Sequence, residues 1–221
     1  MVSSTKKIII YGINQQAQQL YYYLNAELPG RAEAFTVDRD FFQEEMLLGK
    51  PVIPFEDVES KYPPTEYCIL LSFGYKNMMR NREEKYWNCK KRGYEIVNFI
   101  SKDAKVYTSD IGEGVIIYPN CVIAPFVKIG NGCFFETSCT IAHHSQIGKF
   151  NFFAPGVTTG GAVKIGNNCF FGISAVIASC RKINDMSVIG AGVTVTNDVE
   201  TETVLRHVEA LQLSRKPEKY I

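Results

Sequence analysis

The stretch IGEGVIIYPNCVIAPFVKIG, residues 111–130, carries two overlapping periods that decide the fold. A large apolar residue recurs every six positions, at Ile111, Ile117, Ile123 and Ile129. An Ile-Gly pair stands at both ends of the stretch, and its two copies are separated by 18 positions. Three sixes per repeat indicate a coil with three short parallel strands per turn and a glycine at one corner, where the backbone needs freedom.

The six-residue period runs without insertion from Ile111 to Val195, and Thr159 is its one position without a large apolar side chain. The Ile-Gly pair returns at the same spacing, at Ile147-Gly148 and Ile165-Gly166. The second half of the chain is therefore predicted to be a parallel β-helix of hexapeptide repeats.

The cysteines fit the interior of such a coil. The chain has 7 cysteines, an odd count. Four of them lie two residues before an apolar position of the period, and alternation along a strand sends both side chains to the same interior. They are expected to act as small buried hydrophobes, with no disulfide, redox or metal role; these are Cys121, Cys133, Cys139 and Cys169.

The first hundred residues alternate between strand and helix patterns. Apolar runs at 6–12, 32–38, 67–74 and 95–100 predict strands, and helical spacing appears at 15–25 and 81–94. This order indicates a small doubly wound parallel sheet, which binds ligands beyond the carboxyl ends of its strands. The expected ligand-binding residues are Gly12, Asn14, Gln16, Asp38, Arg39, Ser72 and Gly74. The first turn reads GINQQA, which lacks the G-x-G-x-x-G dinucleotide fingerprint, so a mononucleotide or sugar nucleotide is favoured over NAD.

Charge and hydropathy exclude several classes of partner. The formal net charge is +1, which gives no electrostatic case for nucleic acid or an anionic membrane surface. No apolar stretch approaches the ~18 residues of a membrane span. The start MVSSTKKIII has too short an apolar run for a secretion signal. A cytoplasmic location is expected.

Three motifs of the second half carry a family resemblance. They are IAHHSQIG at 141–148, APG at 154–156 and VKIGNNCFFG at 163–172, and they follow a Rossmann-like first domain. The chain resembles the sugar acyltransferases of the PglD/NeuD/PerB type over residues 7–198. These acetyl-CoA-dependent enzymes acetylate nucleotide-linked amino sugars or, in the NeuD branch, sialic acid hydroxyls.

The resemblance implies an architecture and an assembly. A Rossmann-like sugar-nucleotide domain is expected at 1–103, a left-handed β-helix acyltransferase domain at 104–198, and a C-terminal tail at 199–221. A homotrimer is expected, with each active site shared between the β-helices of neighbouring chains.

The resemblance also implies catalytic residues. His143 matches the base that removes a proton from the sugar amine or hydroxyl. His144 stands where relatives usually carry an acidic residue that orients the base. Glu136, at a place where a relative contacts substrate through an amide, is expected either to supply the missing carboxylate or to contact the substrate.

The acetyl-CoA site is expected on the coils next to His143. Gly161 follows His143 by 18 residues and should lie one coil below it, where its N–H can face the thioester oxygen. The pantetheine arm is expected near Gly172, Ile173 and Gly190. Gln15 and Gln16 replace the glycine and histidine usual in the nucleotide turn, and Asp38 matches an acidic residue near the nucleotide base.

The favoured function is therefore an acetyl-CoA-dependent N-acetyltransferase of a nucleotide-linked amino sugar, with acetyl-CoA as co-substrate and no metal. Transfer to a sugar hydroxyl is the first alternative. A non-catalytic sugar-nucleotide-binding protein is another. A zinc enzyme on the β-helix needs three histidine ligands, and the repeats contain two.

Overall fold

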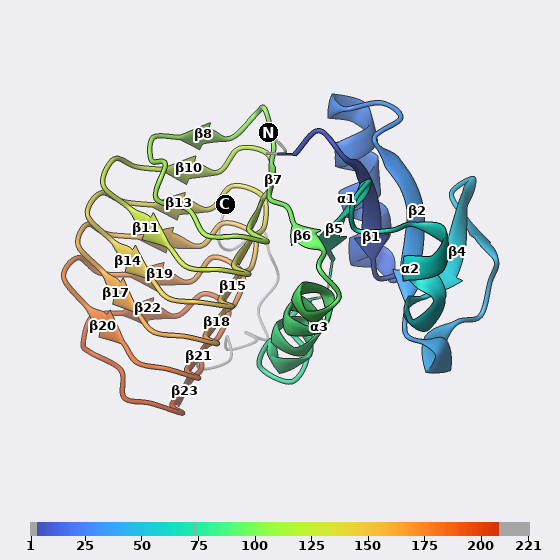
Figure 1. Cartoon of the computed structure of the whole chain (residues 1–221). Helices are drawn as coiled ribbons and strands as arrows, with labels where there is room; N and C mark the ends of the chain where they lie inside the picture. The colour runs from blue at the N-terminus through green and yellow to red at the C-terminus, as the bar shows by residue number, and fades with distance from the viewer. Residues whose placement is uncertain (1–3, 73, 208–221) are drawn as a thin grey trace, which may run out of the picture.

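The computed structural model describes residues 4–72 and 74–207, which form an α/β domain beside a β-helix (Figure 1). The α/β domain has a six-stranded sheet in the order β3-β4-β2-β1-β5-β6. Its strands pair in parallel except for the hairpin between β3 and β4, which the sequence did not predict. The strands are β1 (Lys7–Tyr11), β2 (Ala32–Val37), β3 (Met46–Leu47), β4 (Lys50–Pro54), β5 (Tyr67–Leu71) and β6 (Glu95–Ile96).

Short helices connect these strands. Asn14 caps the first long helix by accepting a hydrogen bond from the Ala17 N–H at 3.0 Å. Ala17, Leu20 and Leu24 repeat at helical spacing and are buried on the sheet side. The helices are α1 (Gln15–Glu27), α2 (Val58–Lys61) and α3 (Arg80–Lys91), with 3₁₀ turns η1 (Arg39–Phe41) and η2 (Phe55–Asp57). None of the helices in the described ranges is long and apolar enough to cross a membrane.

The strand expected at 95–100 is wrong as a single element. β6 pairs with β5, but the next strand, β7 (Phe99–Ile100), pairs with the β-helix instead. Asn98 marks the change: its side chain donates to the Gly112 carbonyl at 2.9 Å and accepts from the Val115 N–H at 2.8 Å. The apolar run at 95–100 thus belongs to two strands that pair with different sheets, and residue type alone does not reveal where one ends and the next begins.

The β-helix consists of three parallel sheets, each made of strands 18 residues apart. Seven strands form the first sheet: β7, β9 (Ile116–Ile117), β12 (Phe134–Phe135), β15 (Phe152–Phe153), β18 (Phe170–Phe171), β21 (Val188–Ile189) and β23 (Val204–Leu205). Six form the second: β8 (Lys105–Val106), β10 (Val122–Ile123), β13 (Thr140–Ile141), β16 (Thr158–Thr159), β19 (Val176–Ile177) and β22 (Thr194–Val195). Four form the third: β11 (Lys128–Ile129), β14 (Gln146–Ile147), β17 (Lys164–Ile165) and β20 (Lys182–Ile183).

The interior of the β-helix confirms the predicted left-handed coil of hexapeptide repeats. Phe135 and Phe153 stack inside it with ring centroids 4.5 Å apart and planes within 10°. The four cysteines expected in the interior are all fully buried and belong to the same apolar core. The division of the chain at residue 104 stays a prediction.

The hydrophobic core of the α/β domain extends onto the outer face of the β-helix, while the β-helix interior forms a second core. Each Phe-Phe strand of the seven-stranded sheet sends one ring inward and one outward. The outward rings of Phe134 and Phe152 stack at 5.2 Å and pack with the core of the α/β domain. The relative position of the domains is therefore set by close packing and not by a linker.

A buried arginine adds polar contacts to this junction. Arg82, on α3, is fully buried and donates to the carbonyls of Leu71, Gly114 and Gly132 at 2.8 to 2.9 Å. Its guanidinium lies 5.4 Å from the Phe134 ring centre. Burial lowers its pKa to about 10, so the side chain stays charged at neutral pH.

Arg82→Ala should lower the free energy of unfolding by about 2–5 kcal/mol, because three buried carbonyls lose a charged donor. Chemical denaturation measures the change. Arg80→Ala is the matched control, since Arg80 is exposed and should change stability within about 0.5 kcal/mol. Equal effects from both substitutions would contradict a stabilising role for the buried guanidinium.

Candidate active site

His143 lies at the corner that follows β13, between the six-stranded and four-stranded sheets. The backbone before it is fixed, because the Ala142 N–H donates to Thr159 Oγ1 at 3.1 Å. Thr159, the one polar residue at an apolar position of the six-residue period, thus fixes the backbone next to His143. Both His143 and His144 are exposed, and their Nδ1 atoms lie 3.0 Å apart.

The contact between the two imidazoles has a chemical consequence. Two Nδ1 atoms at this distance share one hydrogen, so one ring donates and the other accepts. When His143 donates, its Nε2 carries a free lone pair and can take a proton. The His144 ring is supported in turn by Phe126, with ring centroids 4.7 Å apart. The orientation of the His143 ring is therefore restrained by its neighbour.

Gly161 lies directly below His143, as the 18-residue spacing predicted. A Cβ atom at this position would come within 2.7 Å of His143 Cε1 and 2.9 Å of Nε2. Any side chain at position 161 would therefore collide with the His143 imidazole in its present position. Within the described part of the chain, no hydrogen bond is made by the Gly161 N–H.

A cleft of about 590 Å³ lies at the carboxyl ends of β1 and β2. Asp38 in this cleft accepts a hydrogen bond from the Tyr11 hydroxyl and pairs with Lys85 Nζ at 2.9 Å. Burial, and then the Asp38 carboxylate, raise the pKa of Tyr11, so its hydroxyl stays protonated. Lys85 was not predicted from the sequence, because the charged run 80–85 has the composition of a solvated helix face. The lining includes Gly12, Asn14, Asp38, Phe41, Asn81 and Lys85.

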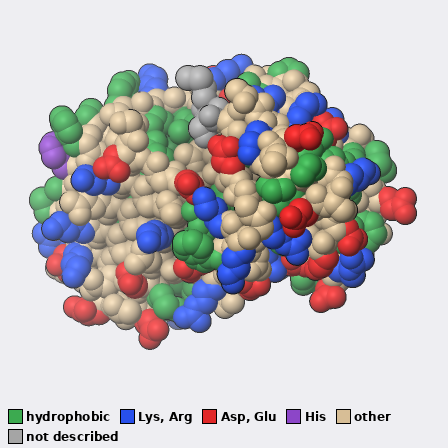
Figure 2. Space-filling model, viewed as in Figure 1, with side chains coloured by type: hydrophobic (Ala, Val, Ile, Leu, Met, Phe, Trp, Pro, Cys, Tyr) green, Lys and Arg blue, Asp and Glu red, His purple; other side chains and the backbone are tan. Residues whose placement is uncertain are grey.

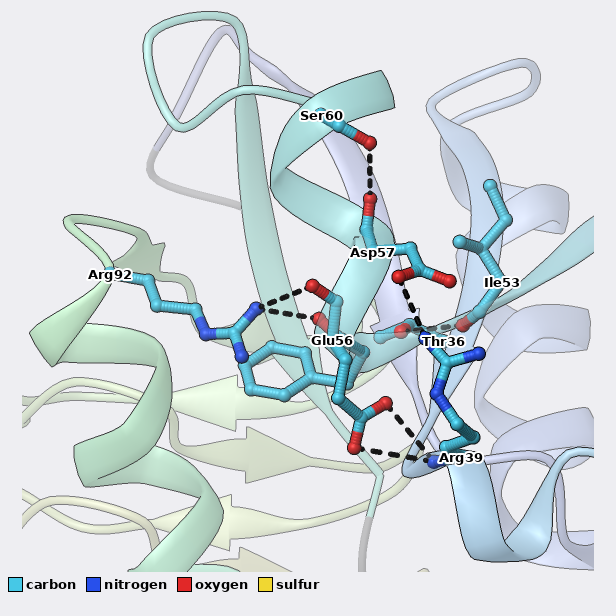
Figure 3. A network of polar contacts seen from close by, with 8 residues as sticks. Thr36, Arg39, Ile53, Glu56, Asp57, Ser60 and Arg92 are labelled. Carbon is cyan, nitrogen blue, oxygen red and sulfur yellow. Dashed lines mark hydrogen bonds and ion pairs between the residues drawn. The ribbon is translucent and has the colours of Figure 1, made fainter.

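Arg39 is not among the residues that line this cleft. The Arg39 guanidinium pairs with the Asp57 carboxylate at 2.7 Å, and the Arg39 backbone N–H donates to the Glu56 carboxylate at 3.1 Å (Figure 3). Arg92 joins the same network through the Phe55 carbonyl at 2.7 Å. In this structure Arg39 closes the end of the sheet and does not reach the expected ligand-binding cleft.

A second hollow, of about 730 Å³, lies at the N-terminus of α1. It is lined by Asn14, Gln15, Gln16, Gly74, Tyr75 and Lys76, among others. The uncapped N–H groups of the first turn and the Lys76 ammonium make this end electropositive. Gly74 leaves room for the Gln16 side chain, since a Cβ atom at this position would collide with Gln16 Oε1.

Gly12 and Ser72 hold the turn that shapes these hollows. Gly12 has a φ of +127°, and a Cβ atom on it would clash with Ser72 Oγ. Ser72 is fully buried and donates to the Tyr11 carbonyl at 2.7 Å. The structure thus places Ser72 in the frame of the turn instead of on its surface.

A third hollow, of about 500 Å³, lies where the two domains meet. Glu136 lines it, is only 8% exposed, and accepts from Gln16 Nε2 at 3.4 Å. Burial raises the pKa of Glu136, and hydrogen bonds from Gln16 and the Thr137 N–H oppose that rise. Gly172 and Ile173 line the same hollow.

The three hollows share lining residues and form one groove. Asn14 and Asn81 belong to the first two, and Gln16, Gln19 and Tyr75 belong to the last two. The groove therefore runs from Asp38, past the start of α1, to the outer corner of the β-helix. It has the length and polarity to take a ligand with several distinct parts.

The groove and the histidine corner lie on different edges of the β-helix. Glu136 follows β12, whereas His143 follows β13, so a side of the six-stranded sheet separates them. Glu136 and His143 are seven residues apart, and at about 3.3 Å per residue the extended chain between them is roughly 20 Å long. In Figure 2 the visible histidine surface lies at the edge of the β-helix away from the α/β domain.

This separation divides the predicted site residues into two groups. Gly161 and His144 lie with His143, while Gly172, Ile173 and Glu136 lie at the groove. Gly190 is on the groove edge, 18 residues after Gly172, where a Cβ atom would approach the Leu205 carbonyl to 2.9 Å. Within one chain Glu136 does not orient His143, because its side chain contacts Gln16 instead. The residues described by the structure include no group of three or more His, Cys, Asp or Glu side chains able to hold a metal ion.

Residues 108–143 match the family model described as bacterial transferase hexapeptide (six repeats). This match covers the first part of the repeats in the β-helix. No curated protein sequence gives a significant match to it.

The chain has the fold of several solved structures. PerB from Caulobacter crescentus, in complex with CoA and GDP-perosamine, has a TM-score of 0.80 and 21% identity, with 91% of this chain and 94% of that chain covered. The acetyltransferase domain of PglB from Neisseria gonorrhoeae, in complex with acetyl coenzyme A, has a TM-score of 0.78 and 20% identity, covering 90% and 96%. WeeI from Acinetobacter baumannii has a TM-score of 0.64 and 22% identity, covering 86% and 96%. At these identities the likeness shows that the two-domain fold is shared.

For the acetyl transfer proposed below, Gly161→Ala should lower kcat by about 10-fold or more, because it pushes the His143 imidazole from its position while the β-helix stays folded. Steady-state acetyl transfer and circular dichroism measure the two effects. The same substitution in a His143→Ala background is the control. There it should change the residual rate little, because the displaced side chain is already gone. An undiminished effect in that background would contradict displacement of His143 as the cause.

Proposed function

We propose that this protein is an acetyl-CoA-dependent N-acetyltransferase whose acceptor is a nucleotide-linked amino sugar. The observation that carries the proposal is His143, held through Nδ1 by His144 and placed over Gly161. The shared fold with PerB, which binds CoA and GDP-perosamine, supports it. Both substrates are cytoplasmic metabolites, so the cytoplasm is the proposed location.

The chemistry needs one base and one oxyanion donor. The acceptor amine loses a proton to His143 Nε2 as its lone pair attacks the thioester carbonyl carbon. The Gly161 N–H is free to donate to the oxygen that becomes negatively charged. When the carbon–sulfur bond breaks, the proton returns from the imidazolium to the CoA thiolate. An acceptor that arrives as an ammonium releases one further proton to solvent.

The groove suits the sugar nucleotide. The diphosphate is placed at the N-terminus of α1, where the first-turn N–H groups and Lys76 favour anions. The nucleoside is placed in the cleft beside Asp38 and Phe41, beyond the carboxyl ends of β1 and β2. The sugar then reaches the hollow beside Glu136.

A second copy of the chain is needed to bring His143 to that sugar. The outer face of the six-stranded sheet lies between the histidine corner and the groove, and from β10 to β22 it carries no charged side chain. This flat face suits packing against another copy, which would place the histidine corner of one chain beside the groove of the next. Three copies close such a head-to-tail contact into a ring, the proposed homotrimer. Its outward residues are Val122, Thr140, Thr158, Val176 and Thr194.

His143→Ala should reduce kcat by about 10²–10⁴, the usual contribution of a general base, with little change in thermal stability. The assay measures thiol release from acetyl-CoA with a panel of UDP-, GDP- and dTDP-linked amino sugars. Lys61→Ala is the control, because Lys61 is exposed at the end of α2 and lines none of the three hollows. Wild-type inactivity across the panel would contradict the proposed function. Near-normal turnover by His143→Ala would assign the base to another residue.

A further inference from the structure

We infer that Glu136 makes the groove selective for an acceptor group that carries positive charge, a protonated amine, over a hydroxyl at the same position. The inference rests on the proposed function and deepens it by assigning the choice of acceptor atom to one side chain. It concerns binding of the acceptor before the chemical step, in which His143 is the base.

The first evidence is that the charge of Glu136 is not balanced. Within the described ranges no Lys, Arg or His nitrogen lies within 4.0 Å of its carboxylate. Its side chain accepts a long hydrogen bond from Gln16 at 3.4 Å and one from the Thr137 N–H, and both of these donors are neutral. Glu136 is a buried residue, and a carboxylate that is buried and lacks a cation is costly to keep ionised, so its charge favours binding of a cation.

The second evidence is the shape and lining of the hollow. Glu136 lies in an open hollow of about 500 Å³ whose other walls are largely apolar, including Phe152, Ala154, Pro155 and Phe170. A ligand can therefore reach the carboxylate, and the apolar walls strengthen any charge interaction made there. The hollow also continues into the groove at Gln16, so a sugar attached to a nucleotide can place one substituent at Glu136.

These two features give a preference between acceptors. An ammonium group would supply the missing cation and several charge-assisted hydrogen bonds to the carboxylate. A hydroxyl would supply one hydrogen bond and leave the negative charge uncompensated. Glutamine at position 136 keeps the size of the side chain and removes this difference.

The first experiment compares acetylation of matched acceptors, each amino sugar nucleotide of the panel with its hydroxy counterpart. Glu136→Gln should lower kcat/KM for the amino acceptor by about 10–100-fold, mainly through KM, and change the value for the hydroxy acceptor by less than about 3-fold. An equal loss for both acceptors, or no loss for the amine, would overturn the inference while leaving the acetyltransferase function intact.

The second experiment needs no acceptor. Burial raises the pKa of Glu136 above its usual value of 4.5, so folding favours the protonated carboxyl. The stability that Glu136 contributes is therefore present in acid and lost as the pH rises through its folded pKa. Glu136→Gln should raise Tm at pH 7 and lose this advantage as the pH falls below about 4.5.

Glu66→Gln is the matched control, because Glu66 is exposed and its substitution should leave Tm nearly unchanged at both pH values. A lower Tm for Glu136→Gln at pH 7 would overturn the inference. It would mean that a cation, supplied in the assembled protein by another copy, already pairs with Glu136.

Discussion

The parallel ladder of the β-helix, in which residue i lies beside residue i+18, is the constraint on which the rest of this structure depends. Thr140 pairs with Thr158 and Ile141 with Thr159, so the corner residues that follow are also superposed. This register places Gly161 against the imidazole of His143 and Thr159 Oγ1 against the Ala142 N–H. The positions of the His143 imidazole and of the Gly161 N–H are thus set by backbone pairing, which is more rigid than a loop.

The same geometry explains why one chain does not complete a site. Each side of the coil is six residues long, so residues seven positions apart fall on neighbouring corners. Glu136 and the groove lie at one corner, and His143 lies at the next. The large shared core at Phe134 and Phe152 fixes the α/β domain over the groove and away from the histidine. Assembly with a neighbouring copy, and not a hinge between domains, is therefore the route that we propose to bring the two halves together.

The repeat made much of this predictable from sequence. Translational symmetry gave the coil, the buried cysteines and the position of Gly161, because a period fixes neighbours without knowledge of packing. The contacts that the sequence did not reveal are those between elements far apart in the chain. Lys85 reaches Asp38 and Arg82 reaches the Gly114 and Gly132 carbonyls because α3 packs at the domain junction. Such pairings depend on tertiary placement and leave no local pattern.

The most direct test of the shared site is complementation between two inactive variants, His143→Ala and Gln16→Trp, the second of which fills the groove beside α1. The two chains are given different tags, produced together and purified through both tags. A site built between neighbours should restore acetyl transfer, because every ring of three that carries both tags has one site in about three with an intact histidine corner and an intact groove. Mixed assemblies that remain as inactive as either variant alone would contradict the account.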